Sequence, residues 1–409
     1  MEWIYRIAIG LADLLLPLVA LFIPKINTFY QGRKQLFPKL KEFRKANSGP
    51  LIWFHVASLG EYEQAKPVIQ ELKSRKQDIK IVVSFFSPSG YIPSSKKPQP
   101  GVDFITYLPL DTLANAQRFI DLIQPEQAYF VKYDLWYHFL KVAKEREISL
   151  YLIAASFRPE QVYFRRGGFF RKVLYFFDHI FTQNLQSIEL LNSIGIDSVS
   201  LTGDTRFDRV NDTAQSPKEF PEIAHWKKEM PVVVLGSVWQ EDMDLLIPLI
   251  NSTRGYKWIV APHDLSPAPM HSWENSLEVK SIFYSKWDQS EDSDLLFIDN
   301  IGMLSSLYQF AKVAYVGGAF GKGLHNILEA IGFGIPVIFG KVRRVSKFPE
   351  AVESVEMGCG FEVGTFEELN SIFGMLEQEE NYLLAKNAAE NWVQSNLGAA
   401  KKIVDFTVN

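Results

Sequence analysis

The sequence lacks several features that would assign it to a broad class of proteins. Its 409 residues include one cysteine, Cys359, so no internal disulfide can form and the chain suits a reducing compartment. Its seven histidines form no HExxH motif and no His/Cys pair at metal-ligand spacing, so we expect no metal and no cofactor. The formal net charge of −4 lacks the basic excess of a general nucleic-acid-binding protein, so we expect no nucleic-acid partner.

What the chain does contain is enough apolar sequence for two domains. Domains of roughly 100 to 200 residues each fit its length, and 47% apolar with 22% charged residues is typical of a globular protein. We predict a membrane anchor with a basic juxtamembrane segment over residues 1–40 and an α/β domain over 41–210. A second α/β domain follows over 211–385, and a C-terminal helix over 386–409 is expected to pack back on the first domain.

The N-terminal segment 7–23 is apolar apart from Asp13, and Trp3 and Tyr5 precede it. As a helix it would reach roughly 26 Å, short of a hydrocarbon core of about 30 Å, and Asp13 and Pro17 weaken a simple span further. Most nearby cations follow it: Lys25, Arg33, Lys34, Lys39, Lys41, Arg44 and Lys45. The positive-inside rule therefore places the rest of the chain at the cytoplasmic face of a membrane. A cleaved signal peptide and a buried core helix are the alternatives, and spanning versus lying in the interface stays open.

Short apolar runs alternate with helical patterns along the chain. We predict strands at 51–57, 79–86, 127–131, 149–155 and 180–183, and again at 232–235, 257–261, 295–298, 313–316 and 336–339. A helical pattern over 61–73 joins the first two strands, and residues 211–231 have the composition of an interdomain connection. Repeated βα units predict two doubly wound parallel sheets, which bind ligands at the carboxyl ends of their strands.

The first strand-to-helix junction places Ser58, Gly60 and Glu61 directly after a predicted strand. Ser-x-x-Glu is a capping-box pattern, in which both side chains satisfy backbone donors of the first helical turn. The same glutamate stands where a general base would accept a proton from an attacking hydroxyl. Both interpretations of Glu61 stay open, and His55 on the strand is predicted to be a packed core residue.

The second junction is rich in glycine. Strand 313–316 leads through Gly317 and Gly318 to a helix start with the sequence His325, Asn326, Ile327, Leu328 and Glu329. The glycines allow a ligand close to the backbone, and a helix start offers N–H donors to a phosphate. Glu329 can accept hydrogen bonds from ribose hydroxyls, and Gly236 with Ser237 forms a second turn for the same nucleotide. Asn-x-x-Glu is also a helix-cap pattern.

Together these residues resemble the Kdo transferases, which move 3-deoxy-D-manno-octulosonic acid (Kdo) from CMP-Kdo to the lipid A precursor. The resemblance runs nearly end to end and rests on Ser58-x-Gly60-Glu61, Tyr107-Leu108-Pro109 with Asp111, Leu135-Trp136, Gly203 with Phe207-Asp208, Ala261-Pro262, Gly302 with Leu304, and Gly317-Gly318 leading to His325-Asn326-x-Leu328-Glu329. It implies a GT-B fold of two Rossmann-like domains facing a cleft, with the acceptor in the anchored domain and CMP-Kdo mainly in the other. The implied partners are CMP-Kdo, the lipid A precursor and the inner-membrane bilayer.

The resemblance also implies residue roles. Glu61 becomes the proton acceptor, and the CMP contacts fall on Pro262, His263, Gly302, Met303, Leu304, Asn326, Ile327, Leu328 and Glu329. To these we add Ser58, Gly60, Gly236, Ser237, Gly318 and His325, which stand at the two junctions and the glycine turn.

Some positions depart from the family pattern. Where the family has Glu-Thr-Glu-Leu-Trp, this chain has Lys132-Tyr133-Asp134-Leu135-Trp136. In the family the first glutamate of this motif assists the transition state. In this chain either Asp134 takes over that role or Lys132 changes it. Arg206 replaces a lysine and keeps a cation for the phosphate. His263 replaces an arginine, and Leu324 replaces a glycine.

The expected reaction is a direct displacement that inverts the anomeric centre, without a nucleophilic carboxylate and without a metal. Arg206, the backbone near Asn326 and His263 would stabilise the departing CMP. Asp242-Met243-Asp244 matches the D-x-D motif of metal-using sugar transferases, but its place at a predicted helix start favours a helix-capping role.

Residues 158–177 interleave cations with aromatic rings, namely Arg165, Arg166, Arg171 and Lys172 with Phe164, Phe169 and Phe170. This pattern favours an exposed helix at a membrane surface, and a basic face over core phenylalanines is the alternative. Two rival functions are kept. One is a GT-B transferase that uses a different nucleotide sugar, and the other is a non-enzymatic membrane-tethered binder of nucleotide or glycolipid.

Overall fold

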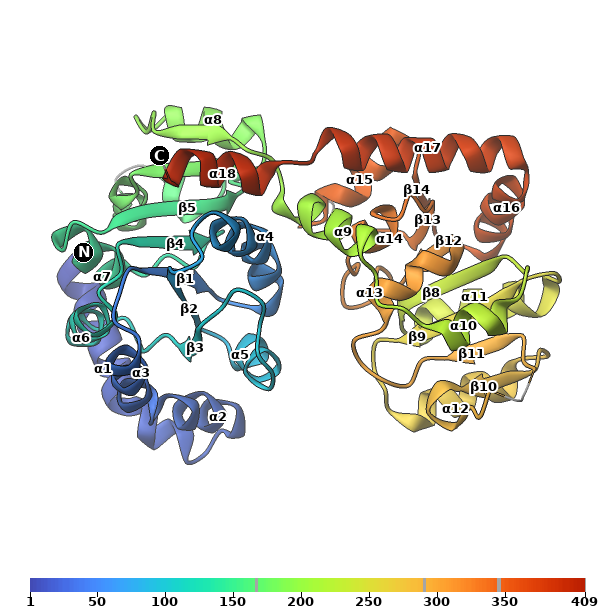
Figure 1. Cartoon of the computed structure of the whole chain (residues 1–409), viewed down its shortest axis with the longest axis horizontal. Coiled ribbons are helices and arrows are strands. Elements are labelled where there is room, and N and C mark those ends of the chain that lie inside the picture. Colours follow the sequence, from blue (N-terminus) through green and yellow to red (C-terminus); the bar gives the residue numbers. More distant parts are fainter. Residues whose placement is uncertain (166–167, 290–291, 344–346, 409) are drawn as a thin grey trace. The chain divides into compact units, whose positions relative to one another are not determined.

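The computed structural model describes residues 1–165, 168–289, 292–343 and 347–408, and the chain divides into two compact units (Figure 1). Unit 1 comprises Met1–Arg209 and Gly398–Asn409, and unit 2 comprises Val210–Leu397. Each unit is built on a parallel seven-stranded sheet with helices packed on it, as the alternation of apolar runs and helical patterns predicts.

In unit 1 the strand order is β3-β2-β1-β4-β5-β6-β7. The strands are β1 Leu51–Val56, β2 Lys80–Phe85, β3 Phe104–Tyr107, β4 Gln127–Val131, β5 Ser149–Ala155, β6 His179–Thr182 and β7 Val199–Leu201. The helices are α1 Glu2–Ala20, α2 Pro24–Arg33, α3 Leu36–Ala46, α4 Leu59–Arg75, α5 Pro88–Ser95, α6 Leu113–Ile123, α7 Tyr137–Glu145, α8 Leu185–Asn192 and α18 Ala399–Val408, with 3-10 helices η1 Val162–Phe164 and η2 Phe169–Phe176. Helix α9 Thr205–Gln215 crosses the boundary between the units.

The sheet of unit 1 is covered on both faces, which explains why β1 is buried at every position. Trp53 belongs to a core cluster with residues of α3, α6 and α7, whereas Phe54 on the opposite face belongs to a cluster with residues of α4 and α18. Helix α18, red in Figure 1, packs against α4. Asp208 accepts hydrogen bonds from the backbone N–H groups of Gly398 and Ala400 where α18 begins.

In unit 2 the strand order is β10-β11-β9-β8-β12-β13-β14. The strands are β8 Val232–Val238, β9 Lys257–Pro262, β10 Ser281–Phe283, β11 Leu295–Phe297, β12 Ala311–Val316, β13 Val337–Gly340 and β14 Gly360–Val363. The helices are α10 Pro221–Lys227, α11 Gln240–Ser252, α12 Pro267–Ser276, α13 Leu304–Leu307, α14 Leu328–Ile331, α15 Pro349–Met357, α16 Phe366–Glu377 and α17 Glu379–Ser395, with 3-10 helices η3 Tyr284–Lys286 and η4 Tyr308–Phe310.

The four strands that the apolar pattern does not predict are the outermost strands of the two sheets, β3 and β7 in unit 1 and β10 and β14 in unit 2. Each is three or four residues long and carries at least one residue that is not fully buried. An edge strand needs less apolar sequence because its outer side has no neighbouring strand. The segment predicted as a connection, 211–231, carries the end of α9 and all of α10.

The described residues of 158–177 form the short helices η1 and η2 and not one long helix. Phe169 is buried and Arg171 donates hydrogen bonds to the carbonyl oxygens of Tyr163 and Phe164, whereas Phe170 and Lys172 are exposed. The expected contact of this segment with a membrane stays a prediction. Arg166, predicted to face a membrane, lies outside the described residues. Phe169 packs 5.3 Å from the ring of Tyr5, so this segment helps to hold α1.

Helix α1 is long and apolar enough to cross a membrane by length and composition. Its Tyr5 hydroxyl donates to the buried carboxylate of Asp111 at 2.6 Å, and its Glu2 pairs with Lys141 of α7 at 2.9 Å. Arg33, one of the cations counted for the positive-inside rule, donates to the carbonyl oxygens of Phe86 and Leu108. The Arg33 guanidinium therefore forms hydrogen bonds inside unit 1.

Candidate functional site

Ser58 caps helix α4 as the sequence pattern predicts, whereas the Glu61 carboxylate accepts from Ala57, the residue before the N-cap, and not from the first helical turn. The Ser58 hydroxyl oxygen accepts from the Glu61 N–H at 3.4 Å, and Glu61 Oε2 accepts from the Ala57 N–H at 2.5 Å. Among the described residues we find no hydrogen bond to the other oxygen, Oε1. The capping and catalytic interpretations are therefore compatible, because the contact with Ala57 orients the carboxylate through one oxygen and leaves the second available to a substrate.

The surroundings of Glu61 raise the pKa of its carboxyl group. Burial raises the pKa of the Glu61 carboxyl above its ordinary value of 4.5, and the Ala57 N–H opposes this shift. The nearby Asp134 carboxylate raises this pKa further, while His55 and Lys132 lower it. A carboxylate with a raised pKa is a stronger base than one in water, which suits proton abstraction from a hydroxyl.

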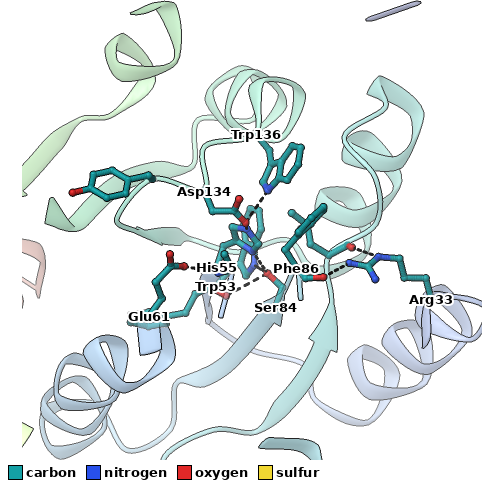
Figure 2. A network of polar contacts seen from close by, with 12 residues as sticks. Arg33, Trp53, His55, Glu61, Ser84, Phe86, Asp134 and Trp136 are labelled. Carbon is teal, nitrogen blue, oxygen red and sulfur yellow. Dashed lines mark hydrogen bonds and ion pairs between the residues drawn. The ribbon is translucent and has the colours of Figure 1, made fainter. Parts of the chain in front are cut away.

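A polar network surrounds Asp134 in the loop after β4 (Figure 2). Its Oδ2 accepts from Trp136 Nε1 at 3.0 Å and pairs with His55 Nε2 at 2.8 Å, and the other ring nitrogen of His55 lies 2.9 Å from the Ser84 hydroxyl. His55 is fully buried, as its prediction as a core residue requires, but it is not merely packed. The sequence signal that was missed is a pair of polar residues within the apolar runs of β1 and β2, which the sheet register places side by side.

In unit 2, a pocket of about 570 Å³ lies beside the ends of β8 and β9. Five of the predicted nucleotide-binding residues line it, namely Ser237, Pro262, His263, Gly302 and Leu304. Met303 is nearly buried. Gly236 lies close to the Tyr308 hydroxyl, where an added Cβ would come within 2.2 Å, so the turn requires a residue without a side chain.

An aromatic stack borders this pocket and joins its two sides. The ring of His263 lies 4.6 Å from that of Trp239 and 4.3 Å from that of His325, and Trp239 Nε1 donates to His325 Nε2 at 3.2 Å. The Lys322 ammonium lies 4.3 Å from the centre of the Trp239 ring. Sequence reasoning missed Trp239, although a tryptophan directly after a glycine turn at a strand end was the available signal.

The D-x-D sequence is explained by capping. Asp242 Oδ2 accepts from the backbone N–H groups of Trp239 and Gly318, and Oδ1 accepts from the Tyr315 hydroxyl. The carboxylate is buried and ties the start of α11 to the glycine loop after β12. Gly318 has φ of 97°, a backbone conformation that favours glycine, and this loop brings His325 against it.

The helix predicted to open with His325 to Glu329 begins at Leu328 and is short. Asn326 Oδ1 accepts from the Leu328 N–H at 3.2 Å, yet α14 has only four residues, so its dipole is small. The side chains of Ile327 and Leu328 are fully buried, and only their backbone groups can contact a ligand. Glu329 accepts from Asn326 Nδ2 at 3.3 Å.

Comparison with known proteins agrees with both the fold and the sequence motifs. Residues 31–209 match the family described as 3-deoxy-D-manno-octulosonic-acid transferase (kdotransferase). The Kdo transferase of Aquifex aeolicus is 28% identical over 83% of this chain and 89% of its own length, and that of Rickettsia prowazekii is 24% identical over 87% and 78%. Residues 31–209 thus have the domain of the Kdo transferase family, and the similarity to named Kdo transferases extends over most of the chain. These findings support a glycosyltransferase.

The structure of the UDP-GlcNAc 2-epimerase of Neisseria meningitidis shares the fold, with a TM-score of 0.61 at 17% identity over 88% of this chain and 98% of that one. At this identity the similarity concerns architecture alone. The two parallel sheets of this chain therefore have the GT-B fold.

The main departure from the Kdo transferase pattern lies beside Glu61. Burial raises the pKa of Asp204, but Arg206 and, to a smaller degree, Lys132 outweigh it and hold that pKa below its ordinary value. Arg206 Nε donates to Asp204 at 2.7 Å, and Lys132 also lowers the pKa of Glu61. Lys132 therefore acts electrostatically on both the Glu61 and the Asp204 carboxyl groups, at a position where the family pattern has a glutamate.

The stacked histidines His263 and His325 predict a pH dependence of the stability of this protein. Burial, and then the neighbouring His263, lower the pKa of His325 from 6.5 to about 4. Between these values the unfolded chain binds a proton that the folded chain does not, so the free energy of unfolding should fall as the pH drops from about 6.5 to about 4. We expect the urea midpoint to fall more between pH 7 and pH 5 for the natural chain than for His325→Asn. Equal falls in both proteins would contradict this assignment.

Proposed function

We propose that the chain transfers Kdo from CMP-Kdo to a hydroxyl of the lipid A precursor, lipid IVA, with inversion at the anomeric carbon. The observation that carries this proposal is the arrangement of Glu61 at the end of β1, with one oxygen held by Ala57 and a raised pKa. The match of residues 31–209 to the Kdo transferase family, and the similarity to named Kdo transferases, support Kdo as the sugar that is transferred. The pocket at the ends of β8 and β9 supports a nucleotide donor.

In the proposed reaction, Glu61 takes the proton of the acceptor hydroxyl. The hydroxyl oxygen forms a bond to the anomeric carbon of Kdo as the bond from that carbon to the CMP phosphate oxygen breaks. CMP leaves with the bonding electron pair, and the phosphate charge is stabilised by cations and backbone N–H groups. Cations near the candidate site are Arg206 and Lys132 in unit 1, and Lys322 and Lys218 in unit 2, where Lys218 donates to the carbonyl oxygen of Gly302.

The proposed place of action is the cytoplasmic face of the inner membrane, and α1 supports attachment in the plane of the interface. Its exposed apolar residues recur every three or four positions: Trp3, Ile4, Ile7, Leu11, Leu14, Leu15 and Leu18. Its other side is held by the bond from Tyr5 to Asp111 and the pairing of Glu2 with Lys141. A spanning orientation would break both contacts, whereas a helix lying in the interface keeps them and buries the apolar stripe.

The decisive experiment is mass spectrometry of the glycolipid formed when the purified full chain receives CMP-Kdo and tetraacylated lipid A precursor. We expect a mass increase of one or more Kdo units together with release of CMP. In parallel, CMP should raise the thermal midpoint and UDP should not. Protection by UDP-sugars without protection by CMP would favour a transferase with another donor. Binding without CMP release would favour a non-enzymatic binder.

A further inference from the structure

One side of α1 faces the body of unit 1, and it includes an acidic residue without a partner. The residues of this side recur every three or four positions, opposite the exposed apolar stripe: Glu2, Tyr5, Ile9, Asp13, Leu16 and Ala20. All of them are buried or half-buried except Asp13, which is exposed. Among the described residues no hydrogen bond or ion pair reaches the Asp13 carboxylate. This carboxylate is therefore available to a ligand.

Asp13 borders a pocket of about 250 Å³ whose lining residues all belong to unit 1. The pocket is lined by residues of α1, α2, α3, α6 and the loop after β3, and the first three of these helices are blue in Figure 1. Its charged lining residues are Asp13, Arg33 and Lys34. Pockets for drug-sized molecules begin at about 300 Å³, so this pocket suits a smaller polar group such as a lipid headgroup.

Arg33 carries a positive charge that no acidic residue in the described structure neutralises. Its guanidinium donates to the carbonyl oxygen of Phe86 at 2.6 Å (Figure 2), and to those of Leu108 at 2.8 Å and Phe29 at 3.1 Å. Burial lowers the pKa of this guanidinium to about 9, and the nearby Tyr107 opposes the shift. The three carbonyl oxygens leave part of the N–H fork of the side chain unused. A buried charge without a counter-charge costs free energy, which an anionic ligand beside Arg33 would offset.

Lys34 adds a second cation to the pocket. Its ammonium lies 5.0 Å from the centre of the ring of Tyr30, which also lines the pocket. The Lys34 side chain is exposed, and in the part of the chain that the structure describes it forms no ion pair with Asp13 or with any other acid. The pocket thus offers two cations and a carboxylate that do not pair with one another. A ligand that carries both a phosphate and an ammonium group can bind charges of both signs at once.

This mixture of charges distinguishes among lipid headgroups. Phosphatidylglycerol has a phosphate but no cation for Asp13, and the trimethylammonium group of phosphatidylcholine has no N–H to donate. A phosphate monoester on a glycolipid carries about two negative charges, which Asp13 would repel. Phosphatidylethanolamine carries a phosphodiester with a single negative charge and a primary ammonium group with N–H donors. Its headgroup therefore matches the two cations and the carboxylate of the pocket.

We propose that the pocket binds the headgroup of phosphatidylethanolamine, with the phosphate at Arg33 and Lys34 and the ammonium at Asp13. This inference rests on the proposed attachment of α1 in the plane of the interface. A helix in that orientation buries its apolar stripe, and its opposite side lies at the level of the headgroups. Asp13 and the pocket are on that opposite side. The bound lipid adds a specific polar contact to the apolar attachment through the stripe.

The test compares vesicles in which phosphatidylethanolamine replaces phosphatidylcholine at a constant share of phosphatidylglycerol, so that the surface charge stays the same. Cosedimentation of the full chain should show a partition coefficient about tenfold higher with phosphatidylethanolamine, because charge-assisted hydrogen bonds are gained. Asp13→Asn and Lys34→Gln should each lose this gain. Both positions are exposed, so these substitutions leave the fold intact. Asp13→Asn should still bind the phosphatidylcholine vesicles at least as strongly as the natural chain.

Two matched variants control for the change in charge. Asp78→Asn lies between α4 and β2, and Lys25→Gln lies on α2; both residues are exposed and outside the pocket. Both variants should keep the preference for phosphatidylethanolamine. A second measurement removes the bilayer: soluble dihexanoyl phosphatidylethanolamine should raise the thermal midpoint of the natural chain, and dihexanoyl phosphatidylcholine should not. Asp13→Asn should abolish this protection.

Equal binding of the natural chain to both kinds of vesicle would overturn the inference. So would an Asp13→Asn protein that keeps the full preference, because phosphatidylethanolamine would then act through the packing of the bilayer. Protection by the soluble lipid A precursor that depends on Lys34, without protection by the soluble phosphatidylethanolamine, would assign the pocket to the acceptor instead. A natural chain that binds no vesicle at all contradicts the proposed attachment, and transfer of Kdo tests the proposed function separately.

Discussion

Glu61→Gln is expected to reduce the rate of Kdo transfer by about 10²- to 10⁴-fold. The glutamine oxygen can still accept from the Ala57 N–H, so the cap and the start of α4 should survive. The amide cannot take a proton from the acceptor hydroxyl, so kcat should fall. CMP release and glycolipid mass spectrometry at saturating substrates measure this change, and thermal protection by CMP should equal that of the natural chain.

Glu71→Gln provides the matched control for this substitution. Glu71 lies on the same helix, α4, and is paired at the surface with Arg75, outside the candidate site. Its replacement should leave kcat within about twofold, because exposed ion pairs contribute little to stability. A Glu61→Gln protein that keeps the full rate while CMP still protects it would remove Glu61 as the base.

As the pH is lowered, the natural chain should lose activity at a higher pH than it would if Glu61 had the ordinary pKa of a glutamate. The active form of a general base is the deprotonated one, and burial raises the pKa of Glu61 above 4.5. The acid limb of the kcat profile should therefore lie above pH 4.5, with the rate falling as the pH drops through the pKa. Removal of the nearby cation in Lys132→Met should move this limb to still higher pH, because Lys132 lowers the Glu61 pKa. A limb that stays in place would show that Lys132 acts elsewhere.

The second large effect is expected from the double substitution Leu14→Glu and Leu18→Glu in α1. Both side chains are exposed, Leu14 at 73%, and they lie one turn apart on the apolar stripe. Burying a leucine contributes about 1.5 to 3 kcal/mol, so loss of two should weaken membrane partition by about 10²- to 10⁴-fold. Cosedimentation with phosphatidylethanolamine and phosphatidylglycerol vesicles measures the bound fraction. Transfer to an acceptor in those vesicles should fall with it, while protection by CMP persists.

Two exposed leucines of unit 2 provide a control for the general effect of adding negative charge to the surface. Leu383 and Leu384 on α17 are also exposed, at 43% and 64%, but they do not belong to the stripe on α1. Changing both to glutamate should leave vesicle binding as in the natural chain. If the α1 variant cosediments as well as this control, the helix is not the attachment site.

The strand predictions are confirmed for the central strands, which are almost fully buried, and they miss the outermost strands of both sheets. The central strands, such as β4 at Gln127–Val131 and β5 at Ser149–Ala155, are apolar over almost their whole length because helices cover both faces of the sheet. The edge strand β7, Val199–Leu201, is only partly buried and has no such pattern. Its existence depends on pairing with β6, which no local window contains.

The residues of the candidate site show the same difference between local contacts, which the sequence predicts, and distant contacts, which it does not. Ser58 and Glu61 can be placed from sequence because a cap is a contact between residues three or four positions apart. Arg33 was counted among the cations that set the orientation at a membrane, yet two of its hydrogen-bond partners lie 53 and 75 positions away. A charge count along the chain cannot distinguish a cation facing solvent from one used as an internal donor.

The sequence by itself determined the alternation of strands and helices, the glutamate in the first turn of α4 and the glycines of the loop after β12, since each depends on near neighbours or on backbone conformation. Only the tertiary structure decided that His55 meets Asp134, 79 positions away, and that Trp239, His263 and His325 stack. Those partners come from separate strand ends. The order of strands in a sheet, which places β1 beside β4 and β8 beside both β9 and β12, is decided by how whole elements pack and not by any local stretch of residues.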